Sequence, residues 1–179
     1  MGILQVYSAT RLGQKAWGIQ VDRVGNVVKE MGIMAAHFTL RRRVMFWETD
    51  LAGIMHFANF FRWMEEAEHA FYRSLGLSVH PLVDGQSATR TGWPRVRALC
   101  DYHAPLRFEE EVDIEVSVVE IRSKSVRFGF HFRKIDPDRT LAASGELTVV
   151  SVASDRATGQ MSAVAVPEAF RLQLQRFLP

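Results

Sequence analysis

A two-residue alternation of apolar and polar side chains over the second half of the chain constrains the fold more than any other feature. Between 112 and 118, every second residue is valine or isoleucine and the residues between them are polar. This is the pattern of a β-strand that buries one face. Three stretches of this kind and one denser apolar run predict strands at 96–102, 112–118, 126–133 and 147–152, with a turn at Asp136-Pro137-Asp138 between the last two.

One strand and one long helix are predicted before these four strands. The strand covers Phe38 to Trp47, where apolar residues keep one parity except at Arg42. A helical period starts at Asn59, a favourable N-cap residue, and runs to about Leu75. The apolar stripe of this helix contains Phe60, Trp63, Met64, Ala67, Phe71 and Leu75, whereas Arg62, Glu65, Glu66, Glu68, His69 and Arg73 are expected to lie mostly away from it, and Gly76 is the stop signal.

These elements predict an α+β domain in which a curled antiparallel sheet of about five strands wraps around one long central helix. A short terminal helix, from Pro167 to Leu178, is expected on the outside. The 179 residues, 47% of them hydrophobic, suffice for a single domain, which we place at 34–179. Residues 1–33 show no sustained period and are expected to be an N-terminal extension: a flexible arm, a weak targeting peptide, or an upstream segment from a misplaced start codon.

Composition argues against several classes of protein. No run of about 18 apolar residues occurs, so we expect no membrane-spanning helix and a cytoplasmic protein. Cys100 is the single cysteine, which rules out an internal disulfide and a cysteine-based metal cluster. The formal net charge of +2 is too weak to predict nucleic-acid binding. The histidines lack metal-binding spacing, so no metal site is expected.

The loop between the first strand and the long helix is the most informative place for chemistry. It carries Asp50 near the strand end and Gly53 three residues later. The first amides of a helix have no partner within the helix and can polarise a thioester carbonyl, while a nearby carboxylate can activate water or attack that carbonyl. An aspartate at this place can equally be a helix cap and nothing more.

The residues around this loop resemble a known active-site signature. Thr49-Asp50-x-x-Gly53 followed by Ile54-Met55-His56-Phe57-x-Asn59-Phe60 is similar to that of the 4-hydroxybenzoyl-CoA thioesterase family and its YbgC-like acyl-CoA thioesterase branch. The segment from Arg95 to Leu106 is similar to the family's second strand and the turn after it. The resemblance implies a hotdog fold, hydrolysis of acyl-CoA thioesters, and a homodimer or homotetramer with its active site between subunits.

The resemblance also implies roles for individual residues. Asp50 matches the catalytic aspartate, acting as nucleophile or general base, and the backbone amide of Phe57 matches the group that faces the thioester oxygen. His56 is expected to orient substrate or to shuttle a proton, with simple packing as the alternative. No cofactor is implied, because coenzyme A is part of the substrate, and acyl-carrier protein is the other possible carrier. The residues expected to bind substrate or position Asp50 are Thr49, Gly53 and Asn59.

Several alternatives stay open. Another group of hotdog thioesterases carries its carboxylate on the central helix, where this chain has Glu65 and Glu66, although a solvated helix face accounts for both. An acyl-thioester hydratase or dehydratase, or a binding protein without catalysis, would show similar patterns. Two basic groups could meet the phosphates of coenzyme A or form ordinary charged strand faces: Arg41, Arg42 and Arg43, and then Arg122, Lys124, Arg127, Arg133 and Lys134.

Overall fold

The computed structural model describes residues 37–78, 89–155 and 157–179. The expected extension at 1–33 lies outside these residues. The main sheet contains β1 (Phe38–Arg43), β3 (Arg95–Tyr102), β4 (Glu111–Ile121), β5 (Ser125–Lys134) and β6 (Leu141–Val150). The other elements are η1 (Phe46–Glu48), α1 (Ala58–Ser74), β2 (Thr89–Gly92), β7 (Val152–Asp155), β8 (Met161–Ala163), α2 (Glu168–Leu174) and η2 (Gln175–Phe177).

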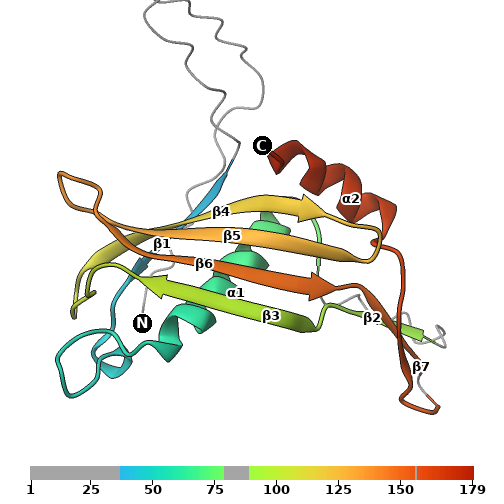
Figure 1. The fold of residues 1–179 in the computed structure, drawn as a ribbon, viewed down its shortest axis with the longest axis horizontal. Helices are drawn as coiled ribbons and strands as arrows, with labels where there is room; N and C mark the ends of the chain where they lie inside the picture. Colours follow the sequence, from blue (N-terminus) through green and yellow to red (C-terminus); the bar gives the residue numbers. More distant parts are fainter. Residues whose placement is uncertain (1–36, 79–88, 156) are drawn as a thin grey trace, which may run out of the picture.

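Five antiparallel strands form the main sheet in the order β1-β4-β5-β6-β3. The strands pair so that their apolar residues share one face of the sheet; Ile114 on β4, for example, lies opposite Phe132 on β5. The sheet curves across one side of α1 (Figure 1). The expected α+β architecture, a curled sheet of five strands around one long helix, is therefore confirmed, and it is the hotdog fold.

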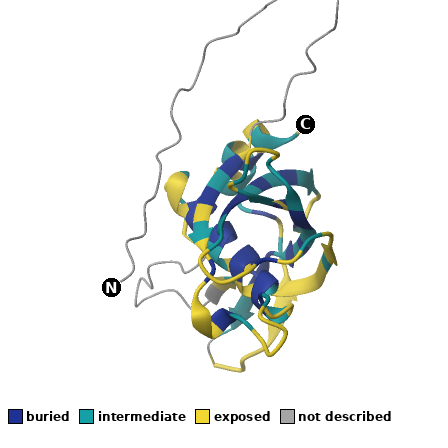
Figure 2. Cartoon of the chain, turned by 90° about the vertical axis from the view of Figure 1, so that its left-hand side faces the viewer, coloured by how far each residue is buried: buried dark blue, intermediate teal, exposed yellow. Residues whose placement is uncertain are grey.

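The hydrophobic core lies between α1 and the face of the sheet turned toward it. Phe128 and Phe130 of β5 project into this space, and so do Trp63 and Phe71 of the predicted helical stripe, all with at most 1% of their surface exposed. Buried residues line the inside of the curled sheet and the facing side of the helix in Figure 2. The sequence patterns thus identify the two surfaces that pack together, the apolar face of the sheet and the apolar stripe of α1.

Two strands differ most from their predicted bounds. β1 ends at Arg43 rather than Trp47, because the Met45 amide donates a hydrogen bond of 2.9 Å to the Glu48 carboxylate and the chain turns into η1. The strand predicted at 147–152 is divided: 147–150 are the end of β6, which starts at Leu141, and Val152 is the first residue of β7. The first half of β6 is rich in alanine, serine and glycine, residues that give little strand signal.

The structure adds a second sheet that the alternation does not predict. Its strand order is β2-β7-β8. The strands have four, four and three residues, too few for a two-residue period to stand out from the background. Two of its strands, β7 and β8, follow β6 in the chain, and β6 ends just before Ser151.

The terminal helix is confirmed within the predicted range as α2 followed by η2. Leu174 is fully buried, and the ring of Phe177 meets the ring of Phe71 edge-on at 4.8 Å between centroids. The segment therefore contributes side chains to the core. Within the described residues, no helix is long and apolar enough to cross a membrane.

Candidate active site

Asp50 stands in a short loop that the chain closes with its own backbone. A bridge between Thr49 and Met55 forms the base of the loop, and the Asp50 amide donates to the Ile54 carbonyl at 2.9 Å. Gly53 adopts a left-handed φ of +72°, which glycine tolerates without strain. The predicted carboxylate is thus held on a closed turn in front of α1.

The Asp50 side chain is exposed in the single chain. Its Oδ1 accepts a hydrogen bond of 2.8 Å from the Ala52 amide, which restrains the carboxylate within the loop. Its Oδ2 has no hydrogen-bond partner among the described residues, so it can accept a proton or a water molecule.

The start of α1 leaves one backbone amide unused. The helix begins at Ala58 with Phe57 in the N-cap position, and the Ala58 amide donates to Nδ1 of His56 at 3.3 Å. The Asn59 amide donates to the His56 carbonyl at 3.0 Å. Within the part of the chain that the structure describes, the Phe57 amide has no acceptor. The predicted oxyanion donor is therefore free, at the positive end of the helix dipole.

Asn59 is not the helix cap, so that expectation is wrong. It is the second residue of α1, and its buried side-chain amide donates to the Glu48 carbonyl at 2.8 Å. Phe57 occupies the N-cap position without a capping side-chain bond, and a ring nitrogen of His56 accepts from the amide of Ala58, the first residue of the helix. Capping propensities favour asparagine over histidine, which is why the sequence points to the wrong residue.

One ring nitrogen of His56, Nδ1, is hydrogen-bonded at the start of α1, and the other, Nε2, is available for substrate. Because Nδ1 accepts from Ala58, the neutral ring carries its proton on Nε2. The ring packs against the Phe57 ring at 4.5 Å between centroids. His56 is exposed, so a proton donor stands beside the free amide.

Thr49 supports the strand side of the loop. Its hydroxyl donates to the Phe46 carbonyl at 2.7 Å inside the η1 turn. The structure thus brings Thr49, Asp50, Gly53, His56 and Phe57 into one loop, and their roles toward substrate remain predictions.

Tyr102 is a site neighbour whose role the sequence does not reveal. It ends the edge strand β3, far from Phe57 in sequence, and its hydroxyl donates to the Phe57 carbonyl at 3.3 Å. Partial burial, together with the neighbouring Cys100, raises the pKa of Tyr102 to about 12, so the hydroxyl is a donor at neutral pH. Its ring meets Phe60 edge-on at 5.1 Å between centroids. Only the folded sheet brings this strand end to the start of the helix.

Comparison with known proteins identifies the family. The profile of the thioesterase-like superfamily matches residues 44–174. The chain belongs to the thioesterase-like superfamily. This confirms the resemblance seen around Asp50, and it makes the protein an enzyme of the thioester hydrolase class.

Three relatives of this thioesterase show how far the likeness extends. It is 29% identical to a 1,4-dihydroxy-2-naphthoyl-CoA hydrolase of Prochlorococcus marinus (strain NATL2A), over 53% of this chain and 64% of that one. A 1,4-dihydroxy-2-naphthoyl-CoA hydrolase of Parasynechococcus marenigrum (strain WH8102) is 28% identical over 76% of this chain and 88% of its own. The solved structure of a gentisyl-coenzyme A thioesterase is 32% identical, with a TM-score of 0.62 over 76% of this chain and 98% of that one.

The helix carboxylates of the thioesterase are engaged in ion pairs. Glu65 lies 3.2 Å from Arg95, and Glu66 pairs with Arg42. Glu68, expected mostly away from the apolar stripe, is instead fully buried and paired with Arg95 at 2.7 Å. Helical periodicity misses this because the partner of Glu68, Arg95, comes from β3, a different element of the fold.

Most of the basic residues considered for phosphate binding are paired with carboxylates of this chain. Arg41 binds Asp113 at 2.9 Å, for example. The remaining pairs are Arg42 with Glu48 and Glu66, Arg43 with Glu111, Arg122 with Glu120, Arg127 with Glu120 and Glu146, Arg133 with Glu115, and Lys134 with Glu110. Charged strand faces therefore account for these residues better than a phosphate site does.

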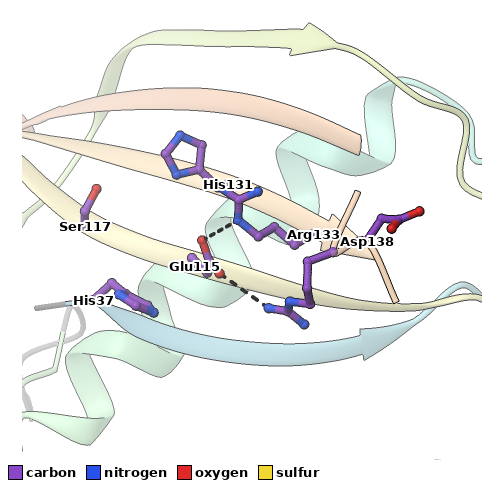
Figure 3. A pocket seen from close by; sticks show the side chains of 7 residues that line it. His37, Glu115, Ser117, His131, Arg133 and Asp138 are labelled. Carbon is purple, nitrogen blue, oxygen red and sulfur yellow. Dashed lines mark hydrogen bonds and ion pairs between the residues drawn. The ribbon is translucent and has the colours of Figure 1, made fainter. Parts of the chain in front are cut away.

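A pocket of about 570 Å³ lies on the face of the sheet turned away from α1 (Figure 3). Its polar side chains come from His37, β4, β5 and the turn after β5, and none of the residues predicted around Asp50 lines it. Within the described residues, no group of three or more histidine, cysteine, aspartate or glutamate side chains could hold a metal ion.

Proposed function

We propose that the protein hydrolyses an acyl-CoA thioester, with Asp50 as the reacting carboxylate and the Phe57 amide as the oxyanion donor. The observation that carries the proposal is the unused Phe57 amide at the start of α1, in the same short segment as the Asp50 carboxylate. A free amide at a helix N-terminus can stabilise the oxyanion of thioester hydrolysis, and a neighbouring carboxylate can act as its base or nucleophile.

Two reaction routes fit these groups. As a general base, Asp50 takes a proton from water while the water oxygen bonds to the thioester carbon and negative charge develops on the carbonyl oxygen, facing the Phe57 N–H. The C–S bond then breaks, and the sulfur of coenzyme A takes a proton. As a nucleophile, Asp50 attacks the thioester carbon and the C–S bond breaks, which releases coenzyme A and leaves a mixed anhydride; water then cleaves this anhydride to the free acid and the Asp50 carboxylate. Both routes release a free acid and coenzyme A.

His56 is suited to assist either route. Its Nε2 proton can be donated to the carbonyl oxygen or to the leaving sulfur. Because Nδ1 is held by the Ala58 amide, the ring has a fixed orientation when it does so.

We propose that a second copy of the chain completes the site. β3 lies at an edge of the main sheet, and seven of its eight residues are exposed. Val96 is 62% exposed and Leu99 41%, so this edge presents unpaired backbone and apolar side chains together. Pairing β3 with its copy would cover both, and it would set Tyr102 and the loop before α1 beside the partner.

An aromatic acyl group is the substrate class we favour. The names of the three relatives specify 1,4-dihydroxy-2-naphthoyl and gentisyl groups, which are hydroxylated aromatic acids. The exposed rings of Phe57 and Tyr102 offer stacking surfaces close to the proposed oxyanion donor. The phosphates of coenzyme A would reach arginines without an ion pair among the described residues, such as Arg107 in the loop after β3.

The test is a thiol-release assay over short, long and aromatic acyl-CoA substrates with the parent protein and Asp50→Asn. We expect hydrolysis by the parent and a loss of about a hundredfold or more in the variant, the scale of a lost acid–base group. Turnover that survives in Asp50→Asn would overturn the role of Asp50 and direct attention to Glu65 and Glu66. Enoyl product without thiol release would indicate a hydratase, and binding without turnover a carrier.

A further inference from the structure

A buried carboxylate that the proposed chemistry does not use lies two residues before Asp50. Glu48 has 2% of its surface exposed. Its Oε1 accepts from Nε1 of Trp63 at 2.7 Å and from Arg42 at 3.1 Å, and its Oε2 accepts from the Met45 amide at 2.9 Å. The side chain is thus bonded to β1, to the η1 turn and to the middle of α1.

The backbone carbonyl of Glu48 is bonded to the other side of the loop. It accepts from the His56 amide at 2.8 Å and from the side-chain amide of Asn59, also at 2.8 Å. One residue therefore joins the end of the strand region, the loop that carries Asp50 and the first turn of the helix. Because the Asp50 loop is enclosed between these bonds, they set the position of Asp50 relative to the Phe57 amide.

Packing alone does not explain a carboxylate at this place. A buried ion pair contributes little net stability compared with apolar side chains of the same volume, because both charges lose their hydration. Arg42 also pairs with Glu66 and lies over the Trp63 ring at 4.9 Å, so the acid is held by a connected polar network. Hydrogen bonds of such a network are directional, so they hold the backbone around Glu48 in one geometry; apolar side chains at the same place would lack these bonds.

We propose that Glu48 is a positioning residue for the thioesterase reaction, holding the Asp50 loop and the Phe57 amide at the spacing that the transition state requires. This inference rests on the proposed function of Asp50. It predicts that weakening the Glu48 bonds lowers kcat while the affinity for substrate, reflected in KM, changes little. A misplacement of about 1 Å remote from the reacting atoms can cost up to a hundredfold in rate.

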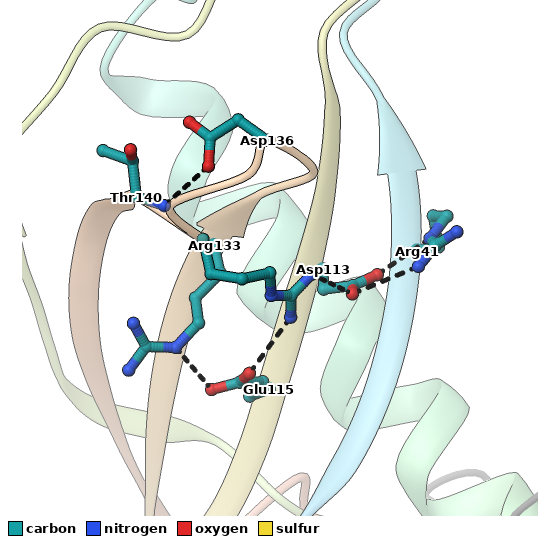
Figure 4. A network of polar contacts seen from close by, with 7 residues as sticks. Arg41, Asp113, Glu115, Arg133, Asp136 and Thr140 are labelled. Atoms are coloured by element: carbon teal, nitrogen blue, oxygen red, sulfur yellow. Dashed lines mark hydrogen bonds and ion pairs between the residues drawn. The ribbon is translucent and has the colours of Figure 1, made fainter.

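The test compares kcat and KM of the parent, Glu48→Gln, Trp63→Phe and Asp113→Asn. Glutamine keeps the shape of the side chain but turns one acceptor into a donor that faces other donors. Phenylalanine at 63 keeps an aromatic ring but removes the N–H bonded to Glu48 together with the five-membered part of the indole, so the melting temperature of this variant is measured beside its kcat. Asp113 is the matched control: it is also a buried carboxylate, bonded to Arg41 at 2.9 Å and Arg139 at 2.6 Å, but it lies on the sheet face turned away from α1 (Figure 4).

We expect Glu48→Gln to lower kcat about tenfold or more with KM within about twofold, and Trp63→Phe to show a smaller loss in the same direction. Asp113→Asn should keep kcat within about twofold even where its melting temperature falls. Should Glu48→Gln fail to fold, Trp63→Phe decides. Unchanged kcat in the folded variants, or an equal loss in Asp113→Asn, would overturn the inference.

Asp50→Asn, assayed alongside, separates the two proposals. If Asp50→Asn is inactive while Glu48→Gln and Trp63→Phe match the parent, Asp50 reacts without help from Glu48. If Asp50→Asn keeps full turnover, the proposed function itself fails, whatever the Glu48 variants show.

Discussion

Arg95, the first residue of the edge strand β3, donates a hydrogen bond of 2.7 Å to Glu68, a carboxylate on α1 with no exposed surface. Arg95 also reaches Glu65 at 3.2 Å. Ion pairs thus link the central helix α1 to β3, the strand that we propose pairs with a second subunit.

Replacing Arg95 by methionine should destabilise the protein by about 3 kcal/mol, because a buried carboxylate loses its cation. The double variant Arg95→Met/Glu68→Met should recover much of the lost stability, because it also removes the buried carboxylate that Arg95→Met leaves unpaired. Urea unfolding of the two variants and the parent measures both effects. A double variant less stable than Arg95→Met would contradict the explanation.

The stability of the parent should depend on pH through Glu68. Burial raises the pKa of Glu68 above its ordinary value, although Arg95 opposes the shift. The folded state then holds the proton more tightly than the unfolded state, so this stability is present in acid and is lost as pH rises from about 4.3 through the raised pKa. Glu68→Gln cannot ionise, and its stability relative to the parent should increase over that range. Urea titrations at several pH values test the sign; a difference that decreases with pH would refute it.

Phe57→Pro should abolish most of the activity without unfolding the protein. Proline removes the N–H that has no acceptor within the described residues, and the φ of −51° at Phe57 lies within the range of a proline ring. Loss of one oxyanion donor costs about a hundredfold to a thousandfold in kcat. Phe57→Ala keeps the amide and is the control: kcat should stay close to the parent, and loss of the stacking ring should appear in KM. Circular dichroism confirms that both variants fold.

The two functions of His56 can be separated by substitution. His56→Asn retains an acceptor for the Ala58 amide, whereas His56→Ala loses it and should cost about 1 kcal/mol. If Nε2 assists the reaction, both variants lose kcat although only the alanine variant loses stability. Parent-like kcat in His56→Asn would restrict His56 to its capping role.

Charges placed on β3 should dissociate the proposed dimer. Val96→Lys/Leu99→Lys introduces two cations along the exposed edge, and light scattering after size exclusion should show a monomer. We expect kcat/KM to fall at least about tenfold, since the site would lose its partner. Leu172→Lys, at an exposed position on α2, is the control and should keep both mass and activity. A parent protein that is already monomeric would disprove the pairing.

Short-range patterns were sufficient for the main elements. The alternation at 112–118 predicts β4, and the stripe from Phe60 to Phe71 predicts the buried side of α1, because both depend only on neighbouring residues along one element. The Asp50 loop was also recognisable, since its residues are contiguous in the chain.

Contacts between distant segments decided the rest. Glu68 becomes buried only because β3 packs beside α1, and Tyr102 reaches the Phe57 carbonyl only because the sheet folds back over the helix. The acceptor at the helix start is a ring nitrogen of His56, although asparagine is the usual capping residue. Periodicity reports which face of an element is apolar, whereas the partner of a polar side chain is set by three-dimensional packing, which no local pattern encodes.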